Sequence, residues 1–219
     1  MAGLGRDPRR RLNHSMSMPL AQLLSGPVDV AARGLLGCVL SAHGVTVRLT
    51  EVEAYDGVGL DAASHAHRGR TPRNAVMFGR AGLAYVYFTY GMHWCLNVVC
   101  GEDGEASAVL LRAGSIVDGL ELARSRRPSA TDRDLARGPA RLTQALAITG
   151  AQNGTDLLAK DSAVRLRPAD PGTDHGSVEV RSGPRVGVVG EAQREWRFWL
   201  AGEPSVSTYR AAVVRRQRG

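Results

Sequence analysis

An acidic run that ends in an aromatic residue stands at positions 50–55, TEVEAY. A carboxylate can take a proton from water, and an aromatic ring can stack on a planar group. Residues 45–51 alternate between apolar and polar types, which predicts a strand with one buried face, and on that phase Glu51 and Glu53 continue the buried line. A buried carboxylate is costly unless it has a partner or a task. We therefore predict a catalytic role for Glu53 and keep a structural role open for Glu51.

Three further tyrosines stand close together in the run 84–92, AYVYFTYGM. The alternation predicts a strand on which Tyr85 and Tyr87 share a face, with Tyr90 next to a Gly-Met turn. Tyrosine is a common strand residue, so one interpretation places all three in the sheet core. The other is chemical, because aromatic faces stack on nucleobases and a side chain at a hairpin tip can wedge between base pairs. Spacing alone leaves both interpretations open for Tyr90.

The basic residues favour a polyanionic partner. Of 28 basic residues only Lys160 is a lysine, the net charge is +7 and the pI is near 10; the alternative explanation of the arginine excess is coding bias alone. Arg70, Thr71 and Arg73 form a loop suited to phosphate contacts, because arginine presents a fork of donors to phosphate oxygens. Arg112 ends an apolar strand and could hold a nearby carboxylate ionised by lowering its pKa.

Spacing disfavours several other kinds of site. His65 and His67 form a His-x-His pair without an evident third ligand, and the three cysteines have no metal-ligand spacing, so we expect neither a metal nor a cofactor. No glycine-rich phosphate loop follows a strand, and no Gly-x-Ser-x-Gly nucleophile motif is present. No run approaches the roughly 20 apolar residues of a membrane span. We expect reduced thiols in a cytoplasmic protein without a signal peptide.

A mixed set of elements must position these residues. The patterns predict helices at 28–37, 116–123 and 138–146, strands at 45–51, 84–90, 93–100, 106–113, 177–181, 185–189, 196–200 and 205–208, and long loops at 56–82 and 150–175. Because strands do not alternate strictly with helices, we expect an α+β fold. It would be a single domain at 18–210, with a curved antiparallel β-sheet and flanking helices, between a disordered basic arm at 1–17 and a basic tail at 211–219.

The chain resembles the 3-methyladenine DNA glycosylases of the alkyladenine glycosylase family, over roughly residues 18–208. The matching strings are LTEVEAY (49–55), DAASH (61–65), RTPRNAVMF (70–78), AYVYFTYGMHWCLN (84–97), VLLRA (109–113), GPARLTQALAI (138–148) and RVGV (185–188). The resemblance implies an enzyme that flips a damaged purine out of duplex DNA and hydrolyses its N-glycosidic bond.

The resemblance also implies the catalytic group. Glu53 would be the general base that activates water, and Arg112 and the backbone carbonyl of Val186 would help to hold that water. Glycosylases that also cut the strand generally attack through an amine. Because Lys160 lies in a polar loop far from the matching strings, we expect a monofunctional enzyme that leaves an abasic site.

The remaining matches imply a base pocket. Tyr55 would stack on one face of the flipped base, with His65 and Tyr87 on the other. Asn97 would exclude purines by crowding a 2-amino group, and Tyr90 would fill the gap left in the duplex. The spacing after Tyr55 is one residue longer than in some relatives, so the next histidine in the loop could take the place of His65.

The expected partner is double-stranded DNA containing damaged purines. Tyr90 and Met92 at the hairpin tip, together with Arg70, Thr71 and Arg73, would contact the DNA. We expect a monomer without membrane association, in the cytoplasm at the nucleoid. Two alternatives stay open: a hydrolase of another glycoside with Glu51 and Glu53 as its carboxylate pair, and a nucleic-acid-binding protein without catalysis.

Overall fold

The computed structural model describes residues 18–168, 178–189, 191 and 193–212; the predicted arm at 1–17 and most of the predicted tail at 211–219 lie outside these residues. Its helices are α1 (Leu20–Leu24), α2 (Val28–Leu35), α3 (Leu120–Arg126) and α4 (Pro139–Ala145), with the 3-10 helices η1 (Ala75–Phe78), η2 (Asp132–Asp134) and η3 (Gly150–Gln152). Its strands are β1 (Val39–Ala42), β2 (Val45–Tyr55), β3 (Ala84–Thr89), β4 (His93–Val99), β5 (Ala108–Asp118), β6 (Val164–Arg167), β7 (Val180–Gly183) and β8 (Arg197–Leu200). None of the helices that the structure describes is long and apolar enough to cross a membrane.

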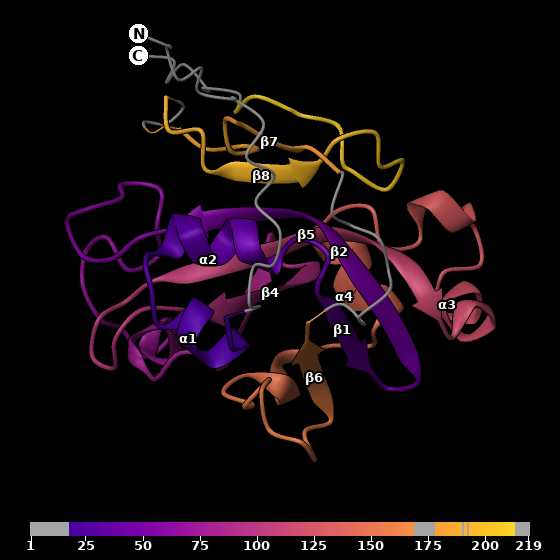
Figure 1. The fold of residues 1–219 in the computed structure, drawn as a ribbon, viewed down its shortest axis with the longest axis horizontal. Coiled ribbons are helices and arrows are strands. Elements are labelled where there is room, and N and C mark those ends of the chain that lie inside the picture. Colours follow the sequence, from indigo (N-terminus) through magenta and orange to yellow (C-terminus); the bar gives the residue numbers. More distant parts are fainter. Residues whose placement is uncertain (1–17, 169–177, 190, 192, 213–219) are drawn as a thin grey trace, which may run out of the picture.

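The strands pair antiparallel in one sheet, in the order β3-β4-β5-β2-β1-β6. β2 is the central strand: β5 pairs along one edge, while β1 and β8 share the other edge, at residues 45–48 and 51–53. β7 pairs with β8, and these two strands lie at the end of the molecule opposite β6 (Figure 1). The predicted α+β fold, a single domain with a curved antiparallel sheet and flanking helices, is confirmed.

One face of the sheet packs in the main hydrophobic core, and the other face lines a cavity. Helices α2 and α4 pack against the central strands and, with α1, close the main hydrophobic core. Alternate strand residues such as Val86, Leu96 and Leu111 belong to that core. Because side chains alternate across a strand, their neighbours, Tyr87 and Leu110 among them, face the other way and line a cavity. The period-2 pattern of the sequence therefore builds a core and a site from the same strands.

A β-bulge in β2 decides where the two glutamates point. The odd-numbered apolar residues of 45–49 belong to the main core, but so do Val52 and Ala54, so the inward positions change from odd to even. The register of β2 against β5 shifts on either side of Glu51, and an extra residue reverses the alternation of side chains. The prediction that Glu51 and Glu53 continue the line of the core was therefore wrong in phase, although both are buried.

Some predicted elements were also wrong. Strand β5 runs on to Asp118, and helix α3 begins at Leu120 where the helix was expected from 116. The segments 185–189 and 205–208, predicted as strands, are turns and coil. In both segments backbone N–H groups bind carboxylates of β2 instead of pairing with a strand. The strands β1 and β6 and the helix α1 were not predicted, because elements of four or five residues contain too few repeats to show a period.

Candidate active site

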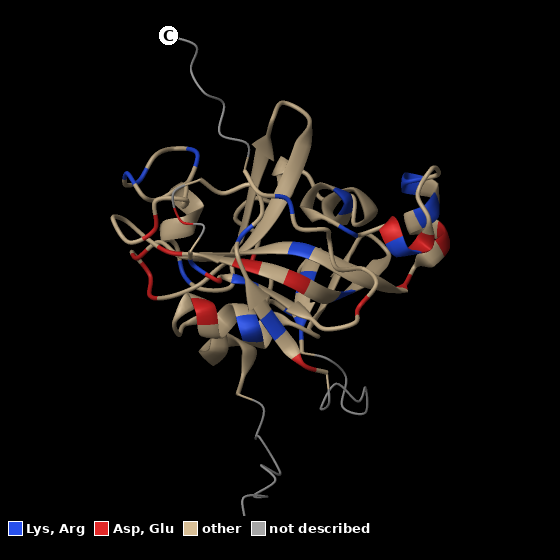
Figure 2. Cartoon of the chain, turned by 90° about the horizontal axis from the view of Figure 1, so that it is seen from above, with Lys and Arg blue, Asp and Glu red and all other residues tan. Residues whose placement is uncertain are grey.

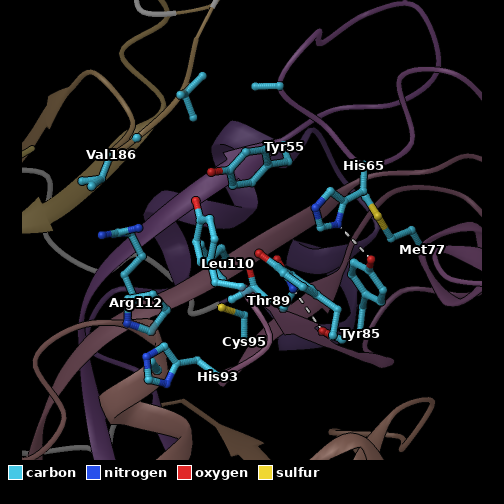
Figure 3. A pocket seen from close by; sticks show the side chains of 18 residues that line it. Tyr55, His65, Met77, Tyr85, Thr89, His93, Cys95, Leu110, Arg112 and Val186 are labelled. Atoms are coloured by element: carbon cyan, nitrogen blue, oxygen red, sulfur yellow. Dashed lines mark hydrogen bonds between the residues drawn. The ribbon is translucent and has the colours of Figure 1, made fainter. Parts of the chain in front are cut away.

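A cavity of about 360 Å³ opens on the face of the sheet that the main core leaves free. Figure 3 shows Arg112 and Val186 on one side of it and His65 and Tyr85 on the other, with Tyr55 between them. β2 ends in the cavity at Tyr55, β3 and β4 supply the neighbouring wall, β5 supplies Arg112, and two loops close the sides. Segments far apart in the sequence therefore converge on one small volume.

Glu53 is fully buried and is not itself a lining residue, but it is bound by residues that line the cavity. The Tyr55 hydroxyl donates to its Oε2 at 2.9 Å, and Arg112 Nη1 donates to the same oxygen at 3.2 Å. The backbone N–H of Val186 donates to Oε1 at 2.7 Å. All three partners line the cavity, so the carboxylate is held in one orientation at its edge. The contact of Val186 with Glu53 is made by its N–H; the predicted role of its carbonyl stays a prediction.

Glu51, which like Glu53 is not a lining residue, has different partners, and two of them, Arg197 and Ser207, do not line the cavity either. Its carboxylate accepts hydrogen bonds from Nε of Arg112 at 2.9 Å and from Nε of Arg197 at 2.7 Å. The backbone N–H and the hydroxyl of Ser207 donate to it at 2.6 and 2.8 Å. Burial alone raises the pKa of Glu51, but the positive charges of Arg112 and Arg197 and the hydrogen bonds of Arg197 and Ser207 bring it below its ordinary value.

Arg112 bridges the two carboxylates, since its Nε binds Glu51 and its Nη1 binds Glu53. Acidic and basic residues lie next to one another on the central strands in Figure 2. Charges this deeply buried are stable only when each one is paired. The geometry therefore favours the structural role that the sequence left open for Glu51.

The opposite wall is aromatic. Nδ1 of His65 lies 2.9 Å from the hydroxyl of Tyr85, and the ring of His65 meets that of Tyr87 edge-on with centroids 4.5 Å apart. Partial burial and the positive charge of Arg73 lower the pKa of His65. Burial raises the pKa of Tyr85 to about 12 and also raises that of Tyr55 and of Tyr87. The phenols are therefore neutral near pH 7, and the wall suits a flat, apolar or cationic ring.

The base pocket expected from the sequence did not include Tyr85, so its contribution to the cavity was missed. Its hydroxyl fixes His65, and its backbone carbonyl accepts a hydrogen bond from Nδ2 of Asn97 at 3.0 Å. Asn97 is buried on β4 and lines the cavity. Because Tyr85 and Tyr87 were predicted to share a face of the strand, the role expected for Tyr87 in the pocket could have been extended to Tyr85.

The loop at 56–82 is shaped by a buried side chain that the sequence analysis also missed. Nδ2 of Asn74 donates to the carbonyls of His65 and Gly69 at 2.8 and 3.0 Å, and its Oδ1 accepts from the N–H of Thr71 at 2.6 Å.

Of the two histidines in this loop, His65 lines the cavity, whereas His67 is absent from its lining. Across the described residues, no three His, Cys, Asp or Glu side chains group closely enough to hold a metal ion.

The basic part of this loop lies beside the hairpin of β3 and β4. Arg70, Thr71 and Arg73 are exposed, and Nη2 of Arg73 donates to the carbonyl of Phe88 at 3.0 Å. This contact ties the loop to β3, one residue before the strand ends. The predicted phosphate-binding residues and the predicted wedge thus lie on neighbouring segments.

The hairpin tip presents two large apolar side chains to solvent. Tyr90 is 87% exposed and Met92 is 66% exposed. Tyr90 has φ of 51° and Gly91 has φ of 66°, and the N–H of Met92 donates to the carbonyl of Thr89 across this turn. Tyr90 also forms part of the cavity rim. The interpretation as a core residue is therefore wrong for Tyr90.

Comparison with known proteins shows the family to which the chain belongs. The family model described as methylpurine-DNA glycosylase (MPG) matches residues 22–204. Proteins named "Putative 3-methyladenine DNA glycosylase" are similar over most of the chain. The one from Nocardia farcinica is 54% identical (86% of this chain, 93% of the relative), that from Streptomyces avermitilis 51% (90% and 94%) and that from Mycobacterium tuberculosis 49% (92% and 98%). The chain therefore belongs to the methylpurine-DNA glycosylase family and is a DNA glycosylase, a hydrolase of base excision repair that acts on DNA.

Proposed function

We propose that this glycosylase removes alkylated or deaminated purines from double-stranded DNA by flipping the damaged nucleotide into the cavity. The observation that carries the proposal is the position of Glu53, held by Tyr55, Arg112 and Val186 at the edge of a cavity with aromatic walls. A volume of about 360 Å³ falls within the usual range for small ligands, roughly 300–1,000 Å³.

In the proposed reaction Glu53 is the general base. It takes a proton from a water molecule whose oxygen forms a bond to C1′ of the flipped nucleotide. The N-glycosidic bond breaks, its electron pair leaves with the base, and the products are a free purine and an abasic sugar. An alkylated purine is already cationic and leaves readily, so one positioned base and one water supply much of the remaining catalysis.

Selection of the base falls to the cavity walls. Tyr55 stacks on one face of the flipped ring, and His65 and Tyr87 stack on the other, where a cationic purine is attracted to the negative faces of the aromatic rings. Asn97 excludes purines that carry a 2-amino group. Flipping costs a few kcal/mol, and less for a damaged or poorly paired base, which adds to the selectivity.

The duplex is held from outside the cavity. Tyr90 and Met92 enter the stack in place of the flipped nucleotide, and Arg70, Thr71 and Arg73 contact phosphates. We propose that the enzyme acts as a monomer and is monofunctional. The only lysine, Lys160, does not line the cavity, so no lysine amine is placed to attack C1′.

The test is release of bases from duplex DNA treated with a methylating agent, with enzyme in excess. Glu53→Gln keeps the shape of the side chain but removes the base, so we expect base release to fall by at least 100-fold. Undiminished release would refute the mechanism. Borohydride added during the reaction should trap no covalent adduct, since an adduct would show attack through an amine.

A further inference from the structure

A fully buried ion pair, Asp61 with Arg185, lies behind the residues that line the cavity. Nη1 of Arg185 donates to Oδ2 of Asp61 at 2.6 Å, and Nη2 donates to Oδ1 at 2.8 Å. Both side chains are 0% exposed, and neither residue lines the cavity. A two-bond pairing of this kind fixes the planes of both groups, so it transmits geometry as well as charge.

The Arg185 end of the pair is connected to the catalytic wall. Nη1 of Arg185 also donates to the carbonyl of Ala54 at 2.9 Å. Ala54 is the residue between Glu53 and Tyr55 on β2. The guanidinium lies over the ring of Tyr55, 4.6 Å from its centroid. The next residue in the chain is Val186, whose N–H binds Glu53. The Arg185 side chain therefore contacts the end of β2 and the stacking ring, and its backbone belongs to the loop that orients the carboxylate.

The Asp61 end is connected to the opposite wall. Oδ2 accepts a hydrogen bond from the N–H of Asp56 at 3.1 Å, and Oδ1 accepts one from the N–H of Ala63 at 3.0 Å. These bonds fold the segment that runs from Tyr55 to His65, so the pair joins the two walls between which a flat ring would lie. Nε of Arg185 is buried without a hydrogen-bond partner among the described residues, so its guanidinium depends on Asp61 and the Ala54 carbonyl.

We propose that Asp61 and Arg185 are positioning residues for base excision: together they set the separation of Tyr55 from His65 and hold Val186 against Glu53. The inference rests on the proposed function, since it assigns these residues to the same reaction. Removal of the pair should slow the chemical step more than it weakens binding of DNA, because a displacement of about 1 Å can cost about 100-fold in rate.

The experiment compares Asp61→Asn, Arg185→Lys and the double variant Asp61→Asn/Arg185→Met. Asp61→Asn keeps the shape of the side chain and one acceptor oxygen for the loop N–H groups of Asp56 and Ala63, and Arg185→Lys keeps the charge but loses the planar fork. The double variant leaves no buried charge without a partner, so it should recover much of the stability that the single variants lose. Each variant is assayed for single-turnover base release from methylated duplex DNA, and for affinity to a duplex with a tetrahydrofuran abasic analogue. Glu203→Gln, which breaks the largely buried Arg48–Glu203 pair elsewhere in the fold, is the matched control.

We expect a loss of about 10- to 100-fold in single-turnover rate for all three variants, with affinity for the abasic analogue changed less than about threefold and Glu203→Gln close to wild type. If the double variant regains both stability and rate, the pair is only structural and the inference is overturned. Wild-type rates in Asp61→Asn and Arg185→Lys, while Glu53→Gln is inactive, would overturn it as well and leave the proposed function intact. A wild-type enzyme that releases no methylated base would overturn the proposed function itself, and this inference with it.

Discussion

Glu51 and Glu53 lie two residues apart on β2 and have different hydrogen-bond partners. Glu53 is bound by groups that line the cavity, including a tyrosine hydroxyl and a backbone N–H. Glu51 is bound by Arg112, Arg197 and Ser207, which join three parts of the chain around β2. The identity of the partners, and not burial, separates the candidate base from the structural acid, because both carboxylates are fully buried.

The surroundings of Glu51 predict a pH-dependent loss of stability. Its pKa is lower in the folded protein than its ordinary value of 4.5, so it stabilises the fold fully above pH 4.5 and loses this contribution as the pH falls toward the folded pKa. Glu51→Gln leaves Arg112 and Arg197 without their shared carboxylate and should cost about 3 kcal/mol at pH 7. In urea unfolding the difference between wild type and variant should shrink below about pH 4.5. A difference that grows as the pH falls would contradict the assignment.

The backbone at Tyr90 predicts that function and stability conflict at this residue. A left-handed φ of 51° is unfavourable for tyrosine, whereas asparagine before glycine is preferred in such a turn. Tyr90→Asn should therefore raise the free energy of unfolding by up to about 1 kcal/mol, or a few degrees in Tm. It should also slow release of methylated bases by about tenfold or more, because the variant lacks the ring that we propose enters the duplex. Tyr90→Phe keeps the ring and the strain, and should match wild type in both measurements.

At the scale of elements, the bulge between β2 and β5 is what turns both glutamates away from the core. Gly114 pairs with Leu49 at this irregularity, and a Cβ on Gly114 would meet Cγ1 of Val47 at 2.3 Å and the carbonyl of Arg48 at 2.4 Å. Glycine is required here by close packing, since its φ does not lie in the left-handed region. The position of the site thus depends on a residue that does not touch it.

Gly114→Ala should force the two strands apart, at a cost of about 1–3 kcal/mol. Because the bulge orients Glu53, the single-turnover rate of base release should fall together with Tm. Gly26→Ala is the control, since its Cβ would meet the carbonyl oxygens of Leu23 at 3.4 Å and of Gln22 at 4.0 Å, both ordinary contacts. A Gly114→Ala enzyme with wild-type Tm and rate would show that the bulge tolerates a side chain.

The sequence predicted elements in which apolar and polar residues alternate over many positions. It did not predict features that depend on a single residue or a single contact. The strands at 84–90 and 93–100 and the shared face of Tyr85 and Tyr87 followed from strict alternation. The change of the core-facing positions of β2 from odd to even at Glu51 could not be predicted in this way, because a β-bulge leaves no reliable sequence pattern in a strand rich in β-branched residues. Nor could the pairing of Asp61 with Arg185, 124 positions apart, since a single chain gives no signal of such a contact.

At the scale of the whole molecule, the fold gathers an aromatic cavity, an apolar hairpin tip and an arginine loop on adjoining segments. Arg73 connects the last two, since it donates to the carbonyl of Phe88 and lies 5.7 Å from the ring centroid of Tyr87. The net charge of +7 adds a long-range attraction to DNA. The proposed function therefore divides recognition: the charge and the arginine loop would bring the duplex, and the cavity would select the base.

This division predicts how salt affects DNA binding. Each phosphate contact releases condensed counterions, so the slope of log K against log salt is about −0.9 per contact. Arg70→Ala and Arg73→Ala should each weaken binding of damaged and undamaged duplexes alike and make this slope shallower by about one. Arg124→Ala is the control, because Arg124 is already paired with Glu121 and Asp132 and has no free charge to offer a phosphate. Fluorescence anisotropy titrations over a range of salt concentrations measure the slopes. Unchanged slopes in the two loop variants would place the phosphate contacts on another part of the surface. Shallower slopes with an unchanged ratio of affinities for damaged and undamaged duplexes would show that this loop binds the DNA backbone. Selection of the lesion would then be left to the cavity.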